Sequence, residues 1–427
     1  HPRNLGRLGR HAMNMVSNWR ANIEARRLQI FVHDLGATGV VRNAIALANE
    51  AAACGYQVRL LVCSSAGLLK DLVSPSVAIV ELSSGHGGHR SRRDTMKAAL
   101  LAYRKHSREW TPDIMISAGN HGHLLSTLAW MGLPGIKLLR FSNDLTHGAP
   151  GAMTRLWRAA KFRLMAKLAD RVVYVSRAQA GFPLVARQLA TGKALVIPNG
   201  VDLNHVRAAA GQDCNHPWVN DGSLPMVLAV GRHVAQKNFP ELLAAFALAR
   251  ASRPMRLIFL GDGTDQEIHR MRRMAMKLGV DRDVAFLPAV SNPFPFMAAA
   301  RTFVLPSRWE GSANVLLEAM ACGTPVVAAR TAGDAEHVLA DGRYGLLVEP
   351  GKIQQLADAI LVQTGPDAVR PGGRAAEFAR IISMGRYVTL FDMLIERNPG
   401  RPVARRHDRF KPWSALPSSR SAGAAAP

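Results

Sequence analysis

The chain has 427 residues and a formal net charge of +23, and 48% of its residues are hydrophobic against 20% charged. This length predicts two domains rather than one, the hydrophobic content excludes a chain that is disordered throughout, and no apolar run is long enough for a transmembrane anchor. The charge favours anionic partners: nucleic acid, phosphorylated substrates or an acidic membrane surface.

Short apolar runs alternate with longer amphipathic ones from Leu28 onward. This alternation predicts a parallel sheet with helices on both faces. The predicted strands of this first series are Leu28–His33, Val58–Cys63, Val77–Leu82, Ile114–Ser117, Lys137–Phe141, Val172–Val175 and Leu195–Ile197. The predicted helices between them are Val40–Ala53, Met96–Arg108, Leu124–Met131, Leu156–Ala169 and Ala178–Ala190.

A stretch without periodicity, Gln212–Pro225, separates this series from a second one. The strands of the second series are Met226–Val230, Leu257–Leu260, Val284–Leu287, Thr302–Leu305, Val326–Ala329 and Leu346–Val348. We therefore predict an α/β protein of two Rossmann-like, doubly wound domains that face each other across a cleft, with ligands at the carboxyl ends of the strands.

The composition divides the chain into six segments. For the helical segment near the end, one option is a return to the first domain. The segments are a basic N-terminal extension (1–27), the first domain (28–205), a linker (206–225), the second domain (226–370), the helical segment (371–397) and a disordered basic tail (398–427).

The window Ser307–Ala329 is the most informative part of the sequence. Ser312 is expected to cap a helix that runs to Cys322 after a strand, which leaves the backbone amides around Ala313–Val315 free to bind an anion. Glu310 lies just before this helix. Glu318 lies within it among apolar neighbours, where a carboxylate needs a specific partner such as a ribose diol.

The run E-G-x-x-x-V-L-L-E-A-M-A-C-G-T-P-V-V in this window resembles the signature of the retaining family-4 glycosyltransferases, which have the GT-B fold. Other pieces of the family pattern follow in the expected order, and the resemblance covers residues 28 to 395. These pieces are Asp170–Ser176, Pro198–Asp202, Gly231–Arg232 with Lys237, and Leu260–Gly263.

The resemblance implies a role for each matching residue. Glu318 would bind the ribose, Glu310 would bind the transferred sugar and act in catalysis, and Arg232 and Lys237 would neutralise the departing diphosphate. A cationic clamp agrees with the chemistry, because negative charge grows on the leaving group and no metal is proposed to absorb it. The remaining donor-binding residues implied are Gly39, Gly263, Asn314, Val315 and Leu316.

Candidates for binding the acceptor follow strands of the first domain. They are Asn120 and His121 after one strand, Asn143 and Asp144 after the next, and His147. The basic loop at residues 85–93 has two interpretations: it binds a lipid diphosphate, or it is a solvated run of charge.

The function predicted is therefore a metal-independent, retaining hexosyltransferase without a cofactor. It would move sugar from a nucleotide-diphosphate sugar to a hydroxyl of a lipid-linked glycan, in bacterial cell-envelope polysaccharide or lipopolysaccharide synthesis. It would be cytoplasmic and peripheral on the anionic inner membrane, without a nucleic-acid partner. The alternatives are a sugar-nucleotide epimerase on the same fold and a basic nucleic-acid-binding protein; the Glu310 and Glu318 signature favours the transferase over both.

Overall fold

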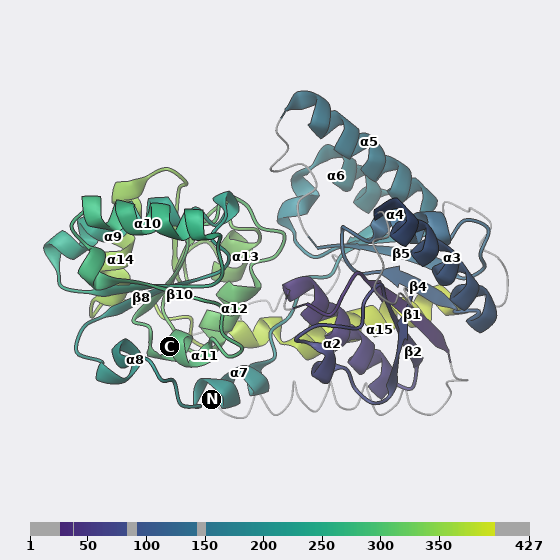
Figure 1. Cartoon of the computed structure of the whole chain (residues 1–427), viewed down its shortest axis with the longest axis horizontal. Helices are drawn as coiled ribbons and strands as arrows, with labels where there is room; N and C mark the ends of the chain where they lie inside the picture. The colour runs from purple at the N-terminus through teal and green to yellow at the C-terminus, as the bar shows by residue number, and fades with distance from the viewer. Residues whose placement is uncertain (1–25, 37, 83–91, 143–150, 398–427) are drawn as a thin grey trace, which may run out of the picture.

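Two parallel sheets organise the chain in the computed structural model, which describes residues 26–36, 38–82, 92–142 and 151–397 (Figure 1). The first sheet has seven strands in the order β3-β2-β1-β4-β5-β6-β7, and its neighbouring strands pair in parallel. Its strands are β1 (Arg27–Val32), β2 (Gln57–Val62), β3 (Val77–Glu81), β4 (Ile114–Ser117), β5 (Ile136–Phe141), β6 (Arg171–Tyr174) and β7 (Ala194–Val196).

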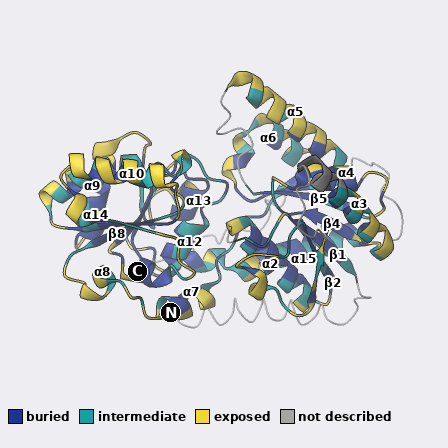
Figure 2. Cartoon of the chain, viewed as in Figure 1, coloured by how far each residue is buried: buried dark blue, intermediate teal, exposed yellow. Residues whose placement is uncertain are grey.

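Helices cover both faces of this sheet, because its central strands β1, β4 and β5 are mostly apolar and nearly every residue in them is buried (Figure 2). The helical elements of the first domain are α2 (Gly39–Ala53), η1 (Lys70–Leu72), α3 (Arg92–Trp110), α4 (His123–Ala129), α5 (Ala152–Leu168), η2 (Ala178–Gly181) and α6 (Pro183–Ala190). The helix predicted over residues 178–190 is split, since Pro183 at the start of α6 holds Phe182 in an extended conformation.

The second sheet has six parallel strands in the order β10-β9-β8-β11-β12-β13. Its strands are β8 (Met226–Val230), β9 (Arg256–Leu260), β10 (Val284–Leu287), β11 (Thr302–Leu305), β12 (Val326–Ala329) and β13 (Leu346–Val348). The prediction of two doubly wound parallel-sheet domains is therefore confirmed.

The helical elements after β7 are α7 (Leu203–Ala210), α8 (Pro217–Asp221), η3 (Ala235–Lys237), α9 (Phe239–Ser252), α10 (Asp265–Lys277), η4 (Asp281–Asp283), α11 (Phe294–Ala299), α12 (Asn314–Ala321), α13 (Ala335–Leu339), α14 (Ile353–Thr364), η5 (Arg374–Phe378) and α15 (Arg380–Glu396). The segment read as irregular thus contains α8, whose first turn is started by Pro217 and capped by the His216 ring. Val206 and Ala209 of α7 lie in the second domain's core.

The chain passes between the domains twice, and the two passages lie side by side. Val201 and Ala379 form a parallel bridge, in which the Val201 amide donates to Phe378 and the Arg380 amide donates to Val201. A Cβ on Gly200 would lie 2.5 Å from the Arg380 Cα, so this close approach requires glycine.

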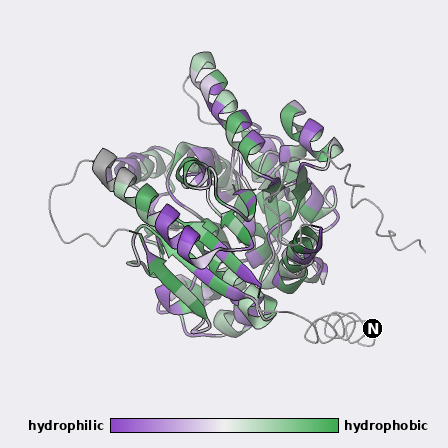
Figure 3. Cartoon of the chain, turned by 90° about the vertical axis from the view of Figure 1, so that its right-hand side faces the viewer, coloured by the Kyte–Doolittle hydropathy of each residue, from purple (hydrophilic) through white to green (hydrophobic). Residues whose placement is uncertain are grey.

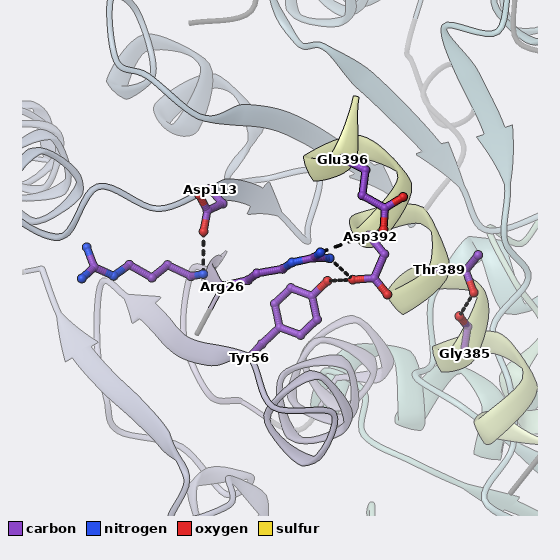
Figure 4. Close-up of polar contacts among 8 residues, drawn as sticks. Arg26, Tyr56, Asp113, Gly385, Thr389, Asp392 and Glu396 are labelled. Carbon is purple, nitrogen blue, oxygen red and sulfur yellow. Dashed lines mark hydrogen bonds and ion pairs between the residues drawn. The ribbon is translucent and has the colours of Figure 1, made fainter. Parts of the chain in front are cut away.

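Helix α15 leaves the second domain by this route and packs in the core of the first, where Tyr387 and Phe391 are buried. Asp392 anchors its far end: the carboxylate pairs with Arg26 at 2.5 Å and accepts a hydrogen bond from Tyr56 (Figure 4). Burial and this carboxylate raise the pKa of the Tyr56 phenol. Helix α15 therefore connects the second domain to the first and packs against the first domain along its length.

Candidate functional site

Two glycines form the end of the second sheet that faces the first domain. Gly231 follows β8 with φ 149°, and Gly261 follows β9 with φ 148°. A Cβ on Gly261 would lie 2.2 Å from the Gly231 carbonyl oxygen, and a Cβ on Gly231 would lie 2.8 Å from Cε of Lys237. The absence of a side chain at Gly261 therefore lets the ends of β8 and β9 approach closely. Its absence at Gly231 leaves space for the Lys237 side chain.

Lys237 and Glu310 form an ion pair at this edge, with 2.7 Å between Nζ and Oε1. Ser307 donates to the same carboxylate oxygen at 2.7 Å, and Gln236 donates to the other at 3.1 Å. The side chains of Lys237 and Glu310 are only 15% and 10% exposed, so the pair is held in a fixed geometry with little solvent screening.

The start of α12 differs from the sequence prediction. Its N-cap is Ala313, without a side-chain cap, and the Ser312 hydroxyl donates instead to Asn314 Oδ1 at 3.3 Å. The Asn314 amide donates to the Ser312 carbonyl, whereas the amides of Ala313 and Val315 donate to no acceptor among the described residues. Two donors at a helix N-terminus are thus available to an anion, fewer than the sequence indicated.

The N-termini of two helices from different domains meet here. A Cβ on Gly39, the first residue of α2, would lie 3.1 Å from Nδ2 of Asn314, the first residue of α12. Asn199, on the first passage between the domains, donates to Asn314 Oδ1 at 3.1 Å. Since both helix dipoles present their positive ends, this interdomain junction is suited to a bound polyanion.

Glu318 lies one turn into α12, on the face of that helix that carries Asn314. Its half-buried side chain has no hydrogen-bond or ion-pair partner among the described residues. Burial raises the pKa of the carboxyl, while the nearby charges of Arg42, Arg380 and Lys237 act in the opposite direction. A carboxylate that is surrounded by cations but bonded to none of them is a free acceptor for the hydroxyl groups of a ligand.

Three other residues predicted for the donor side have less distinctive positions. Arg232 is exposed, and its guanidinium makes no hydrogen bond or ion pair with a described residue. A Cβ on Gly263 would lie 2.6 Å from the His233 Cβ, so this turn needs glycine. The Leu316 side chain is fully buried in the core and its amide donates to Ala313, which gives it a packing role in α12.

The acceptor edge of the first domain is described only in part. Asn120 Oδ1 accepts hydrogen bonds from the amide and the hydroxyl of Ser142, so it joins the ends of β4 and β5. His121 is exposed beside it. The other predicted acceptor residues, Asn143, Asp144 and His147, lie outside the described residues, as does the basic loop from residue 85 to residue 91.

Sequence reasoning missed two polar links between the domains. Asp334, of the second domain, accepts hydrogen bonds from the Ser176 hydroxyl at 2.7 Å and from the amides of Arg177 and Ala178. It therefore caps η2 of the first domain. No neighbouring residue in the sequence signals this contact, since the partners lie more than a hundred residues away.

The second link begins at Arg140, which is 1% exposed at the end of β5. Its guanidinium donates to the Tyr387 hydroxyl at 3.0 Å and to Asn199 Oδ1 at 2.5 Å, and Asn199 in turn reaches Asn314. The one available signal was that Arg140 stands between the apolar residues Leu139 and Phe141 of a strand. Through this chain of contacts, α15 and β5 help to position the start of α12.

Within the described residues, no three His, Cys, Asp or Glu side chains gather as metal ligands would. The groups that the junction offers to an anion are instead Lys237, Arg42, Arg380 and the two helix N-termini. Together with Glu318, they can hold a molecule that has both a negative group and hydroxyls.

Comparison with known proteins agrees with this geometry. The family described as Glycosyltransferase Family 4 matches residues 37–205, and the family described as Glycosyl transferases group 1 matches residues 224–362. The structure of HepE from Anabaena in complex with UDP-glucose has a TM-score of 0.68 at 18% identity, over 86% of this chain and 99% of that one. The fold is thus that of a GT-B protein.

Two curated relatives match parts of the chain. The lipopolysaccharide core biosynthesis glycosyltransferase LpsE of Rhizobium meliloti is 37% identical over 32% of this chain and 38% of its own length. An N-acetylgalactosaminyltransferase of Campylobacter jejuni, which acts on a diphospho-undecaprenol-linked sugar according to its name, is 28% identical over 42% of this chain and 46% of its own length. The matches span less than half of each relative. The chain belongs to the GT-B glycosyltransferases of the family 4 type.

Proposed function

We propose that the protein transfers a sugar from a nucleoside-diphosphate sugar to a glycan hydroxyl, with retention of the anomeric configuration. The observation that carries this proposal is the grouping of the Lys237–Glu310 pair with the unpaired Glu318 at two opposed helix N-termini. A diphosphate suits the cations and amide donors, and the ribose hydroxyls suit Glu318.

In this proposal, each group has one task. The cations and helix ends stabilise the negative charge that grows on the diphosphate as its bond to the anomeric carbon breaks. Glu310, fixed by Lys237, Ser307 and Gln236, orients the sugar. The departing diphosphate oxygen accepts the proton of the acceptor hydroxyl. The hydroxyl oxygen then bonds to the anomeric carbon on the face that the diphosphate leaves. This route requires no protein nucleophile, metal or cofactor.

The proposed acceptor is a lipid-linked glycan of the cell envelope, at the cytoplasmic face of an anionic membrane. The partial relatives support this, because one is named for lipopolysaccharide core synthesis and the other for a diphospho-undecaprenol substrate. No helix in the described part of the chain has the length and hydrophobicity to cross a bilayer.

To test this function, the protein is incubated with a panel of radiolabelled nucleotide sugars and membrane lipid extract, with and without EDTA. We expect label in the organic phase, equal rates with EDTA, and an anomeric configuration by NMR that matches that of the donor. Inverted product would contradict the retaining mechanism, and loss of activity with EDTA would contradict metal independence. Interconversion of nucleotide sugars without an acceptor would instead identify an epimerase, and tight duplex binding at physiological salt would favour the nucleic-acid alternative.

A further inference from the structure

Helix α5 has an outer face that is unusual for a protein in water. Its inner face buries Phe162, Met165 and Ala166 in the first domain. The side chains of its outer face are large and apolar, yet well exposed: Met153 67%, Leu156 66%, Trp157 70% and Leu164 58%. An ordinary surface helix has one apolar face, turned toward the core, so α5 has a second one without a described partner.

The spacing of these four residues places them on one face. Positions 153, 156, 157 and 164 all fall within a narrow sector of a helix with 3.6 residues per turn. Exposed cations border that sector, with Lys161 on one side and Arg163 on the other, and Lys167 lies within it in the last turn of the helix. These three make no ion pair with a described residue, and α5 has five Lys or Arg but no Asp or Glu.

The neighbouring surface extends this property. Helix α4 packs beside α5 and exposes Leu124 and Leu128 as well. In Figure 2, α5 projects from the first domain with most of its length exposed, and in Figure 3 the same helix, at the top of the view, shows hydrophobic and hydrophilic residues along its outer side.

We propose that the outer face of α5 docks on an anionic lipid bilayer. An apolar stripe flanked by cations is what a helix needs to lie in the bilayer interface, with Trp157 and its apolar neighbours among the acyl chains and the cations at the anionic headgroups. The absence of acidic residues from α5 provides the charge complementarity, and the surplus of +23 on the whole chain adds attraction. This inference rests on the proposed function, since docking would hold the first domain beside a lipid-linked acceptor.

Helix α10 of the second domain offers matched controls. It has exposed cations such as Arg273 and Lys277 and an exposed Met276, but its first turn contains Asp265 and Glu267. The charge variant Lys161→Glu with Lys167→Glu is therefore compared with Arg273→Glu and Lys277→Glu, which change the net charge equally. The apolar variant Leu156→Ser with Trp157→Ser is compared with Leu248→Ser of α9 combined with Met276→Ser of α10, both of which are exposed.

The measurement is co-sedimentation with vesicles of phosphatidylcholine, alone or mixed equally with phosphatidylglycerol. We expect the wild type to prefer the anionic vesicles and to detach as salt is added. Both α5 variants should bind at least about thirtyfold more weakly, the equivalent of two interfacial cations, whereas both second-domain control variants should remain within about threefold of the wild type. Thermal melts confirm that each variant is folded.

Calorimetric titration with UDP separates this inference from the proposed function. All four variants should bind UDP as the wild type does, and a wild type that binds none of UDP, ADP and GDP would count against the function while leaving the vesicle result intact. The docking proposal is overturned if the α5 variants bind anionic vesicles as tightly as the wild type, or if neutral vesicles bind equally well. It is also overturned if ultracentrifugation shows a wild-type dimer that the Leu156 and Trp157 substitutions convert to a monomer.

Discussion

The donor edge of the second domain and the acceptor edge of the first are built differently. At the donor edge, three side chains hold Glu310 in place, and the Lys237 side chain packs against Gly231, where a larger residue would displace it. At the acceptor edge, Asn120 serves to join two strand ends, and His121 is exposed. The difference suggests that one edge is preorganised for a common chemical group, while the other provides few fixed contacts.

The largest effect that would test this contrast is the loss of the pair at the donor edge. Lys237→Ala should lower turnover by about 100- to 1,000-fold but weaken UDP binding by less than about tenfold, because charge on the diphosphate grows during the reaction. Glu310→Gln should leave UDP binding nearly unchanged while turnover falls. Initial rates and calorimetric titration with UDP measure both quantities, with exposed Lys277→Ala as the control; equal losses of turnover and binding would refute the division of roles.

The second effect concerns Glu318, whose carboxylate is unpaired until ligand binds. Glu318→Gln should weaken UDP binding by about 1.5–3 kcal/mol, the range for a hydrogen bond to a charged group. The same change should stabilise the free protein by about 1 kcal/mol at neutral pH, because it removes a partly buried charge.

The sign of this stability effect follows from the pKa of Glu318, which burial raises. The folded carboxyl binds a proton at higher pH than the unfolded one, so its contribution is full below the unfolded pKa and is lost as pH rises through the folded pKa. Urea unfolding at several pH values checks this, with the exposed Glu109→Gln as the control. A variant that binds UDP normally and turns over normally would remove Glu318 from the donor site.

A third effect, of about 2 kcal/mol, is expected at the link between the domains. Asp334→Ala would leave the Ser176 hydroxyl and the Arg177 amide without their acceptor, and the Ala178 amide with only its bond to the Ser176 hydroxyl oxygen. We expect a larger radius of gyration by small-angle scattering without ligand, and partial recovery on adding UDP. The exposed Asp358→Ala is the control, and an unchanged radius would mean that other contacts hold the domains together.

These contrasts also explain how much could be predicted from the sequence. The strands of both sheets follow from local apolar runs, and the interval between Glu310 and Glu318 places them before and within α12. Local patterns also predicted a cap at Ser312, which the structure replaces by a contact between Ser312 and Asn314. Here the Ser312 hydroxyl donates to the side chain of Asn314, two residues further along the chain, and does not cap the helix.

The links across the junction could not be predicted in the same way. Arg140 and Asn199 are 59 residues apart, so their contact depends on the complete first domain, and Asn199 and Asn314 are 115 apart, so theirs depends on how the two domains are placed. The same holds for Asp334, whose carboxylate meets a helix end of the other domain. Residues that act within one loop are thus visible in the sequence, whereas residues that join domains become visible only in the fold.

The smallest effect concerns pH and the layer beneath each edge. His123, below the acceptor edge, is fully buried against Phe141 with its Nδ1 2.8 Å from the Ser117 hydroxyl, and burial lowers its pKa to about 3. The pKa of the unfolded residue is about 6.5, so below this pH the unfolded chain binds a proton that the folded chain does not bind. Stability is therefore full above that pH and declines as pH falls toward the folded pKa.

His233, below the donor edge, is also buried and its pKa is also lowered, but the nearby charges of Asp262 and Glu267 oppose the shift. The first domain should accordingly be the more acid-sensitive one. Between about pH 7.5 and 5.5, His123→Gln should reduce the loss of unfolding free energy by about 1 kcal/mol, and His233→Gln should reduce it by less. Urea unfolding at the two pH values measures this loss, and a dependence on pH that neither variant alters would mean that other groups control the acid sensitivity of both edges.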